Sequence, residues 1–220
     1  MRPTPREAAI PSSVQKPGRL SVRDLRRGEL IEAAIRTIAE RGYDQTTIRD
    51  IAQAAGTAPG SIHYHFASRE ELLQEALVDS DRRFRNEVRE EVAKVPGALD
   101  KLSRLFDLCF PEDEARVAFL KVVIDFWHQA TRRDDFRSLF DSAHHAWINE
   151  LEQILDAGGR EGELSLSSSP RDEAMGLAAM IDGLSLYCFV TNQVKATDAR
   201  RILRERAAEF RPSVQETEES

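Results

Sequence analysis

This sequence of 220 residues contains only two cysteines, and it has neither a long apolar run nor a recognisable signal peptide. The two cysteines, Cys109 and Cys188, set up neither a disulfide framework nor a metal-ligand spacing, so we expect buried free thiols. No stretch approaches the roughly 18 apolar residues of a membrane helix, and the first 20 residues contain no apolar core of a signal peptide. The sequence therefore predicts a cytoplasmic protein without a membrane partner.

Catalytic and metal-binding patterns are also missing. Neither a Gly-x-Ser-x-Gly elbow nor a glycine-rich phosphate loop occurs. His63 and His65 are two positions apart, so on a helix they point to different faces and cannot share one metal ion. The adjacent His144 and His145 fail for the same reason. We therefore expect no catalytic site, no metal and no cofactor, and a binding protein rather than an enzyme.

Charge is distributed unevenly along the chain. The net charge of -7 argues against a nucleic-acid partner, because phosphate binding is typical of basic domains. However, residues 1–66 hold ten Lys and Arg against seven Asp and Glu, whereas the rest of the chain holds 21 against 31. One end of the molecule can therefore face DNA while the remainder repels it.

Apolar residues between about 21 and 211 recur at helical spacing, with no persistent strand-like alternation and no internal repeat. The first 20 residues contain four of the nine prolines and too few apolar side chains to form a core. Gly158-Gly159 is expected to end a long helix that begins near Phe136. The pattern predicts an all-α protein with a disordered basic arm at 1–20, a small helical domain at 21–67, a connecting helix at 68–94, a larger helical domain at 95–211 and an acidic tail at 212–220.

The stretch "TTIRDIAQAAGTAPGSIHYHF" predicts a helix-turn-helix. Thr47 can cap its first helix in a capping box with Asp50, and Gly56 allows a sharp turn. In the second helix, Ile62 and Phe66 share one apolar face, and polar and aromatic residues cover the others. The second helix of such a motif lies in the major groove of DNA. A short aromatic helix in a protein core or interface is the alternative.

The segment "ELIEAAIRTIAERGYDQTTIRDIAQAAGTAPGSIHYHFASREELLQEAL" closely resembles the N-terminal domain of the tetracycline-repressor (TetR) family of bacterial transcription factors. The resemblance implies a homodimeric DNA-binding repressor that a small-molecule effector releases from a palindromic operator. The serine that usually caps the family's recognition helix is absent, so Thr57 is expected to cap instead. The DNA contacts fall on Thr47, Arg49, Pro59, Gly60, Ser61, His63, Tyr64 and His65.

The C-terminal half, with "FWHQATRRDDFRSLFDSAHHAW" and "IDGLSLYCF", is similar in layout to the choline-responsive repressors of betaine synthesis. In that case Trp127 and Trp147 offer ring faces to a quaternary ammonium or a polyamine, and Asp125 or Asp182 supplies negative charge. An apolar or aromatic effector, or tryptophans that only pack the core, are the alternatives. The resemblance directs the search for an effector pocket to Phe106, Cys109, Phe110, Val123, Asp125, Phe126, Trp127, Trp147, Met180 and Tyr187.

The segment from 172 to 190 is apolar around nearly its whole circumference, which in a protein without membrane spans indicates cover by a second subunit. The last helix is expected to start at a cap formed by Thr197 or Asp198. In the family, the last two helices of each subunit form the dimer interface. That role falls on Leu177, Ile181, Leu184, Phe189, Ile202, Leu203 and Phe210.

Several alternatives remain open at this point. The same arrangement can activate rather than repress transcription, and an adaptor that uses the aromatic helix to bind another protein would lack salt-dependent DNA affinity. An enzyme would turn over the ligand of the C-terminal pocket, although no motif favours it. Whether arginines of the arm reach a minor groove is also open.

Overall fold

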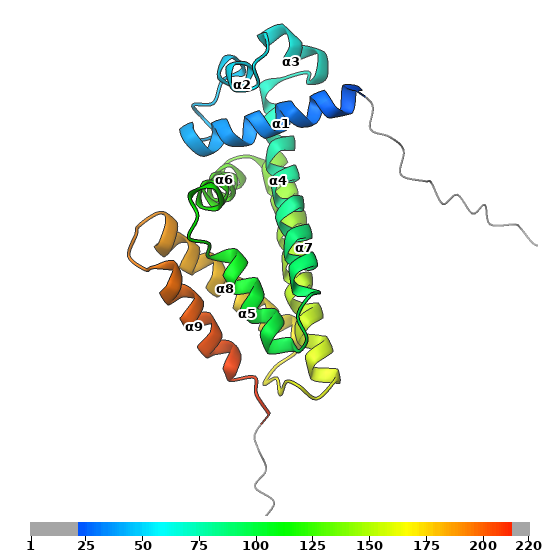
Figure 1. The fold of residues 1–220 in the computed structure, drawn as a ribbon, viewed down its shortest axis with the longest axis vertical. Coiled ribbons are helices and arrows are strands. Elements are labelled where there is room, and N and C mark those ends of the chain that lie inside the picture. The colour runs from blue at the N-terminus through cyan, green and yellow to red at the C-terminus, as the bar shows by residue number, and fades with distance from the viewer. Residues whose placement is uncertain (1–21, 213–220) are drawn as a thin grey trace, which may run out of the picture.

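The computed structural model describes residues 22–212, which form nine α-helices and no strand and confirm the predicted all-α class (Figure 1). The predicted arm at 1–20, and all of the predicted tail at 212–220 except its first residue, lie outside the described part of the chain. None of the helices in 22–212 combines the length and apolar character of a membrane span. The helices are α1 (Val22–Arg41), α2 (Ile48–Ala54), α3 (Pro59–His65), α4 (Arg69–Val92), α5 (Ala98–Cys109), α6 (Glu114–Ala130), α7 (Asp134–Arg160), α8 (Pro170–Phe189) and α9 (Ala196–Ala208).

α2 and α3 form the helix-turn-helix that the sequence predicts, and α1 packs against it. The hydroxyl of Thr47 accepts a hydrogen bond from the amide of Asp50, whose carboxylate accepts from the amide of Thr47, so α2 begins with a complete capping box. Gly56, in the left-handed region at φ +61°, makes the turn toward α3. The expected cap by Thr57 is wrong: Ala58 is the N-cap of α3 and makes no side-chain bond. Thr57 instead ends α2, since its amide donates to a carbonyl of that helix.

α4 connects two hydrophobic cores. Its first half adds Leu72 and Leu73 to a core shared with α1, α2, α3 and parts of α6 and α7. Its last turns add Val88 and Val92 to a second core, built with α5, α7, α8 and α9. At 24 residues the helix is about 36 Å long, and it runs between the two ends of the molecule in Figure 1. A displacement of α4 therefore affects both cores.

α7 passes through the glycine pair that was predicted to end it. The helix continues to Arg160, and Gly162, at φ +75°, is the left-handed residue that follows its C-terminus. Gly158 is needed for close packing instead, because a Cβ atom there would lie 2.5 Å from the Cβ of Ala98 on α5. The helix terminus is thus set by Gly162, and Gly158 allows α5 to pack against α7.

The last two helices pack side by side at the end of the molecule opposite α3 (Figure 1). The predicted caps of α9 are wrong: Lys195 is the N-cap, and Thr197 and Asp198 lie within the first turn. The carboxylate of Glu173 on α8, which is 6% exposed, accepts a hydrogen bond of 2.6 Å from Arg206 on α9. This partly buried ion pair fixes how the two helices are aligned.

Candidate DNA-binding surface and effector cavity

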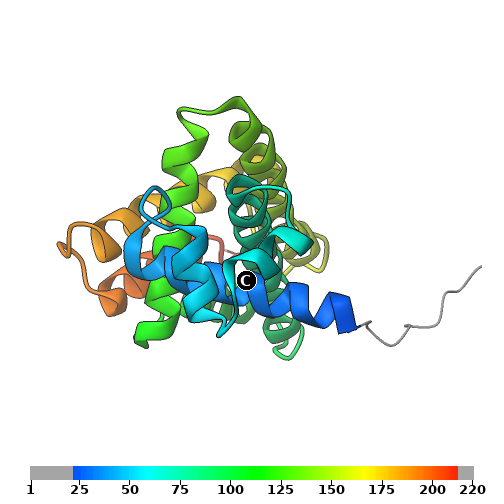
Figure 2. The same cartoon turned by 90° about the horizontal axis from the view of Figure 1, so that it is seen from above.

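α2 and α3 lie at one end of the molecule, nearest the viewer in Figure 2. Their outer side carries polar and aromatic side chains. Ser61 and His65 are half-buried, whereas the side chain of Tyr64 is 71% exposed. The ring of Tyr64 is therefore accessible to a partner. The structure leaves the other predicted DNA contacts exposed as well: Thr47, Arg49, Pro59, Gly60 and His63.

Cationic side chains accompany the aromatic ones on this surface. The guanidinium of Arg23 on α1 lies 5.5 Å from the centre of the Tyr64 ring. Arg49 is exposed, and no residue between 22 and 212 forms an ion pair with it. The ring of His65 packs edge-on to that of Tyr64 at 5.1 Å. The arginines are therefore available to phosphates, which is what positions a protein on a duplex.

Arg69, which the sequence did not single out, fixes the loop between α1 and α2 to the first turn of α4. Its guanidinium donates hydrogen bonds to the backbone carbonyls of Thr46 and Tyr43. It also lies 5.1 Å from the centre of the Tyr43 ring. The side chain of Arg69 thereby attaches the loop before α2 to α4, so the position of α4 influences the position of α2.

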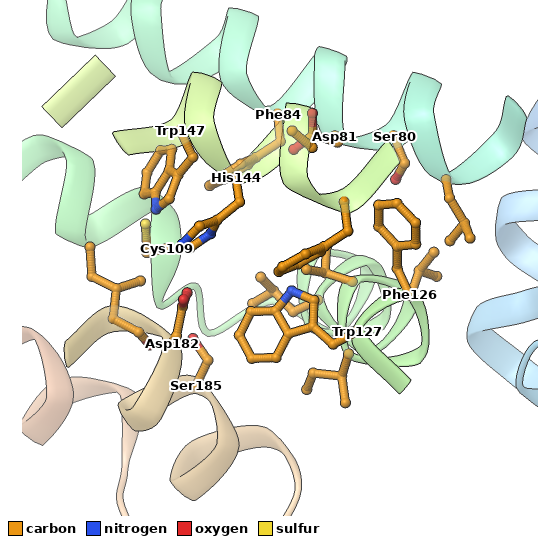
Figure 3. Close-up of a pocket in the computed structure, with 18 residues that line it drawn as sticks. Ser80, Asp81, Phe84, Cys109, Phe126, Trp127, His144, Trp147, Asp182 and Ser185 are labelled. Atoms are coloured by element: carbon orange, nitrogen blue, oxygen red, sulfur yellow. Dashed lines mark hydrogen bonds between the residues drawn. The ribbon is translucent and has the colours of Figure 1, made fainter. Parts of the chain in front are cut away.

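A cavity of about 100 Å³ lies beside the middle of α4, between α6, α7 and α8 (Figure 3). Its walls consist mainly of aromatic and aliphatic side chains, with a few polar groups between them. The lining residues are Leu77, Ser80, Asp81, Phe84, Cys109, Leu120, Val122, Val123, Ile124, Phe126, Trp127, Phe140, Ala143, His144, Trp147, Ile181, Asp182 and Ser185.

Aromatic rings from three helices face the cavity (Figure 3). Trp127 on α6 meets Phe140 on α7 edge-on at 6.2 Å, and Phe140 stacks on His144 at 5.4 Å. Trp147 on α7 lies 5.9 Å from Phe84 on α4. Burial is the main cause that lowers the pKa of His144, with help from neighbouring His145, so its ring is neutral at pH 7. The walls therefore present π faces without a positive charge.

One carboxylate in the cavity has no counter-charge. Among the side chains that the structure describes, none forms a hydrogen bond or ion pair with Asp182 on α8, and partial burial raises the pKa of Asp182 to about 6. Burial also raises the pKa of Asp81, but Arg85 donates a 2.9 Å hydrogen bond to that carboxylate and partly compensates. A partly buried carboxylate without a counter-charge is unfavourable and favours a cationic ligand.

Half of the residues predicted to form the pocket lie elsewhere. Phe106 and Phe110 are fully buried in the second core, and Met180 packs against that core. Asp125 faces the α1–α2 loop, and Tyr187 is half exposed on the outside of α8. Helical spacing alone could not separate the cavity face of a helix from its core face. The structure brings together the remaining five: Cys109, Val123, Phe126, Trp127 and Trp147.

Other cavity residues were missed in the sequence. Phe140 and His144 lie seven and three positions before the predicted Trp147 on α7, which places all three on one helical face. That spacing was a usable signal, although it does not distinguish a cavity from a core. Phe84 lies in helical phase with Leu77 and Val88 and was expected on the inner side of this helix, but nothing in the sequence assigned it to a cavity. Asp81 gave no signal.

The surface of α8 that remains uncovered is not the predicted one. Leu177, Leu203 and Phe210 are at most 1% exposed, and Ile181 is buried in the cavity wall. A side chain already buried in its own subunit has no surface left for a partner, so the prediction is wrong for these four. Leu184, Phe189 and Ile202 are only partly buried. The exposed apolar side chains of α8 and its C-cap are Met175, Ala179, Leu186, Tyr187 and Val190.

Two family models match the chain over these two regions. Residues 30–76 match the bacterial regulatory proteins of the tetR family, and residues 98–212, more than half of the chain, match the C-terminal domain of BetI-type transcriptional repressors. The first match contains α2 and α3, and the second contains α6, α7 and α8.

Curated relatives and solved structures agree with these matches. The repressor KstR2 of Mycobacterium tuberculosis is 33% identical over 60% of this chain and 68% of its own, and the regulator BetI of Agrobacterium fabrum is 29% identical over 76% and 78%. A regulator from Saccharomonospora viridis, solved in complex with choline, is 28% identical with a TM-score of 0.74 and covers 81% of this chain and 93% of its own. A Rhodococcus regulator has a TM-score of 0.75 at 26% identity, over 85% and 98% of the two chains. The chain therefore belongs to the TetR family of transcriptional regulators, with a C-terminal domain of the BetI repressor type.

Proposed function

We propose that this protein is a homodimeric repressor that binds a palindromic operator through α3 of each subunit and leaves it when a small molecule enters the cavity. The observation that carries the proposal is the position of the cavity, which lies beside α4 between the two cores that α4 connects. The family assignment favours this function over a protein-binding adaptor, because the exposed surface of α2 and α3 coincides with the DNA-binding module.

The effector in this proposal is a small organic cation. Trp127, Trp147 and the neutral His144 supply ring faces, and Asp182 supplies an unpaired negative charge. Each cation–π contact in such a site contributes roughly 0.5–2 kcal/mol. The choline complex of the Saccharomonospora viridis regulator supports this class of ligand. A purely apolar effector would leave the charge of Asp182 uncompensated.

A second copy of the chain covers the exposed face of α8 in this proposal. Gly176 and Ala179 lie on that face beside Met175, and small residues let two helices approach closely. With a two-fold axis at this end, the recognition helices fit half-sites about 34–36 Å apart. Dimerisation also raises DNA affinity, since a single module contacts only one half-site.

Effector binding acts through α4 in this mechanism. Leu77, Ser80 and Phe84 of α4 line the cavity, so a ligand that repacks them displaces the helix. Arg69 at the start of α4 carries the α1–α2 loop with it and changes the separation of the two recognition helices. A coupling of about 1–3 kcal/mol, typical of allosteric proteins, weakens operator binding by roughly 5- to 150-fold.

The test begins with DNA. Genome fragments enriched by the purified protein supply the operator, whose affinity is then measured at several salt concentrations with and without choline. Tyr64→Ala, with its exposed ring removed, should keep the dimer but lose operator affinity. If no fragment is enriched over random DNA, the repressor function is wrong and the adaptor becomes the better hypothesis.

Choline binding has a direct optical readout. The chain contains only two tryptophans, Trp127 and Trp147, and both line the cavity. Their fluorescence should therefore change when a cation binds, and Trp147→Phe should leave Trp127 as the single reporter. A response to an apolar compound, with none to choline or tetramethylammonium, would contradict the cationic effector.

A further inference from the structure

Two side chains of α6 hold the loop that connects α1 to α2. The carboxylate oxygen Oδ2 of Asp125 accepts a hydrogen bond of 2.8 Å from the backbone amide of Tyr43. One turn later, Nε2 of Gln129 donates a 3.2 Å hydrogen bond to the carboxylate of Asp44. Gln129 is only 5% exposed, so its amide has little access to water as a substitute partner. α6 thus contacts the DNA-binding domain through specific polar bonds.

The loop is shaped to receive these bonds. Gly42 ends α1 in the left-handed region at φ +79°, and a Cβ atom there would lie 3.4 Å from Oδ2 of Asp125. The hydroxyl of Thr46 donates to the carbonyl of Gly42 at 2.8 Å and closes the loop on itself. The next residue, Thr47, caps α2. A displacement of this loop is therefore passed directly to the start of α2.

The same two turns of α6 form a wall of the cavity. Val123, Phe126 and Trp127 line it, and they alternate along the helix with the residues that hold the loop. Phe126 also packs edge-on against Phe136 at 5.9 Å, and the ring of Phe136 contacts that of Tyr43 at 5.3 Å. A ligand that displaces α6 therefore acts on both the loop and the core beneath it.

We infer that Asp125 and Gln129 are positioning residues that link the cavity directly to the helix-turn-helix, as a second route beside α4. The inference rests on the proposed function and adds the path of its regulation. The loop is held from two sides, by Arg69 on α4 and by Asp125 on α6. A shift of α6 relative to α4 must either carry the loop along or break one set of bonds. The bonds of α6 are therefore required for full release from DNA.

The test is a double-mutant cycle with two independent ways to fill the cavity. Choline is one, and Ala143→Phe, which places a ring in the cavity from α7, is the other. Each is applied to the wild-type chain, to Asp125→Ala, and to Asp125→Asn, which keeps an oxygen that can accept from Tyr43. Lys121→Ala, an exposed position on α6, is the matched control. Operator affinity is the measured quantity, and tryptophan fluorescence monitors choline binding.

In the wild-type chain and in Lys121→Ala, filling the cavity should weaken operator binding about tenfold, within the range of known couplings. In Asp125→Ala, filling the cavity should weaken operator binding less than about threefold. The operator affinity of this variant without ligand, and its affinity for choline, should stay within about threefold of the wild-type values. In Asp125→Asn, filling the cavity should again weaken operator binding nearly as much as in the wild-type chain. A purely structural role would not produce this pattern, because it would lower operator affinity itself.

Three results would overturn the inference. The first is an equal loss in Asp125→Ala and wild type, which would leave the proposed repressor intact with α4 as its only route. The second is a wild-type chain whose operator affinity responds to neither choline nor Ala143→Phe. The third is failure of Asp125→Asn to restore the response. If Asp125→Ala does not fold, Gln129→Ala takes its place in the cycle. Failure of the wild-type protein to bind any operator would instead refute the proposed function.

Discussion

The partly buried, unpaired carboxylate of Asp182 should lower the stability of the ligand-free protein when it is ionised. Burial raises its pKa from an ordinary value of 3.8 to about 6. At about 1.4 kcal/mol for each unit of pKa, ionisation of this group lowers the free energy of unfolding by up to about 3 kcal/mol at neutral pH. Asp182→Asn has nearly the same shape and no charge, so it should stabilise the ligand-free protein by up to this amount.

The pH dependence gives the sign of the effect. Because the pKa of the folded protein exceeds that of the unfolded chain, the stability that protonated Asp182 provides is complete below about pH 4. It is lost as the pH rises from about 4 through about 6. Urea unfolding of wild type and Asp182→Asn should therefore give similar free energies near pH 4 and a growing difference up to pH 7.5. Asp141→Asn, at an exposed position on α7, is the control for the charge change.

The same substitution should remove cation binding. In wild type, choline affinity should fall about tenfold between pH 7.5 and pH 5, where about nine-tenths of a carboxyl of pKa 6 is protonated. Asp182→Asn should bind choline weakly at both pH values. An Asp182→Asn protein that is no more stable than wild type at pH 7.5 would refute the view that this charge is held in the cavity at the expense of stability. Unchanged choline affinity would refute its role in binding.

Three further predictions concern the fold and the DNA complex. Gly158→Ala should lower the free energy of unfolding by about 1–3 kcal/mol, because its methyl group would collide with Ala98; an unchanged urea midpoint would contradict this packing. Arg49→Ala should reduce the slope of log affinity against log salt by about 1 if the arginine contacts a phosphate, and an unchanged slope would place it away from the backbone. Ala179→Arg should convert the dimer to a monomer in sedimentation, whereas Lys121→Ala should not; a dimeric Ala179→Arg protein would place the interface elsewhere.

Local sequence patterns predicted the DNA-binding end in detail. The capping box of Thr47 and Asp50 and the turn at Gly56 depend on residues close in the chain, so they could be inferred without the tertiary structure. The exception was Thr57, where the hydroxyl was expected to cap α3 although the residue completes the end of α2 instead. Arg69 was missed because its partners, the carbonyls of Tyr43 and Thr46, belong to a distant loop.

The C-terminal half was harder to predict because every helix there is covered on more than one side. Trp127 and Trp147 were assigned to the pocket through resemblance, and both line it. Phe106 is also an aromatic residue on a helix and was assigned to the pocket in the same way, but it is fully buried in the core. Asp125 was selected as a charge for the effector, yet its carboxylate is directed at the amide of Tyr43. The identity of these side chains carried no information on which neighbour each one faces.

By itself, the sequence determined the all-α class, the helix-turn-helix and the exposed aromatic surface of α3, since helical periodicity, caps and turns act over a few residues. Only the tertiary structure decided which face of α8 stays uncovered and which of two candidate aspartates lies unpaired in the cavity. It also decided that α6 holds the α1–α2 loop. These features depend on contacts between helices far apart in the chain, and such contacts are set by the packing of whole faces rather than by local spacing.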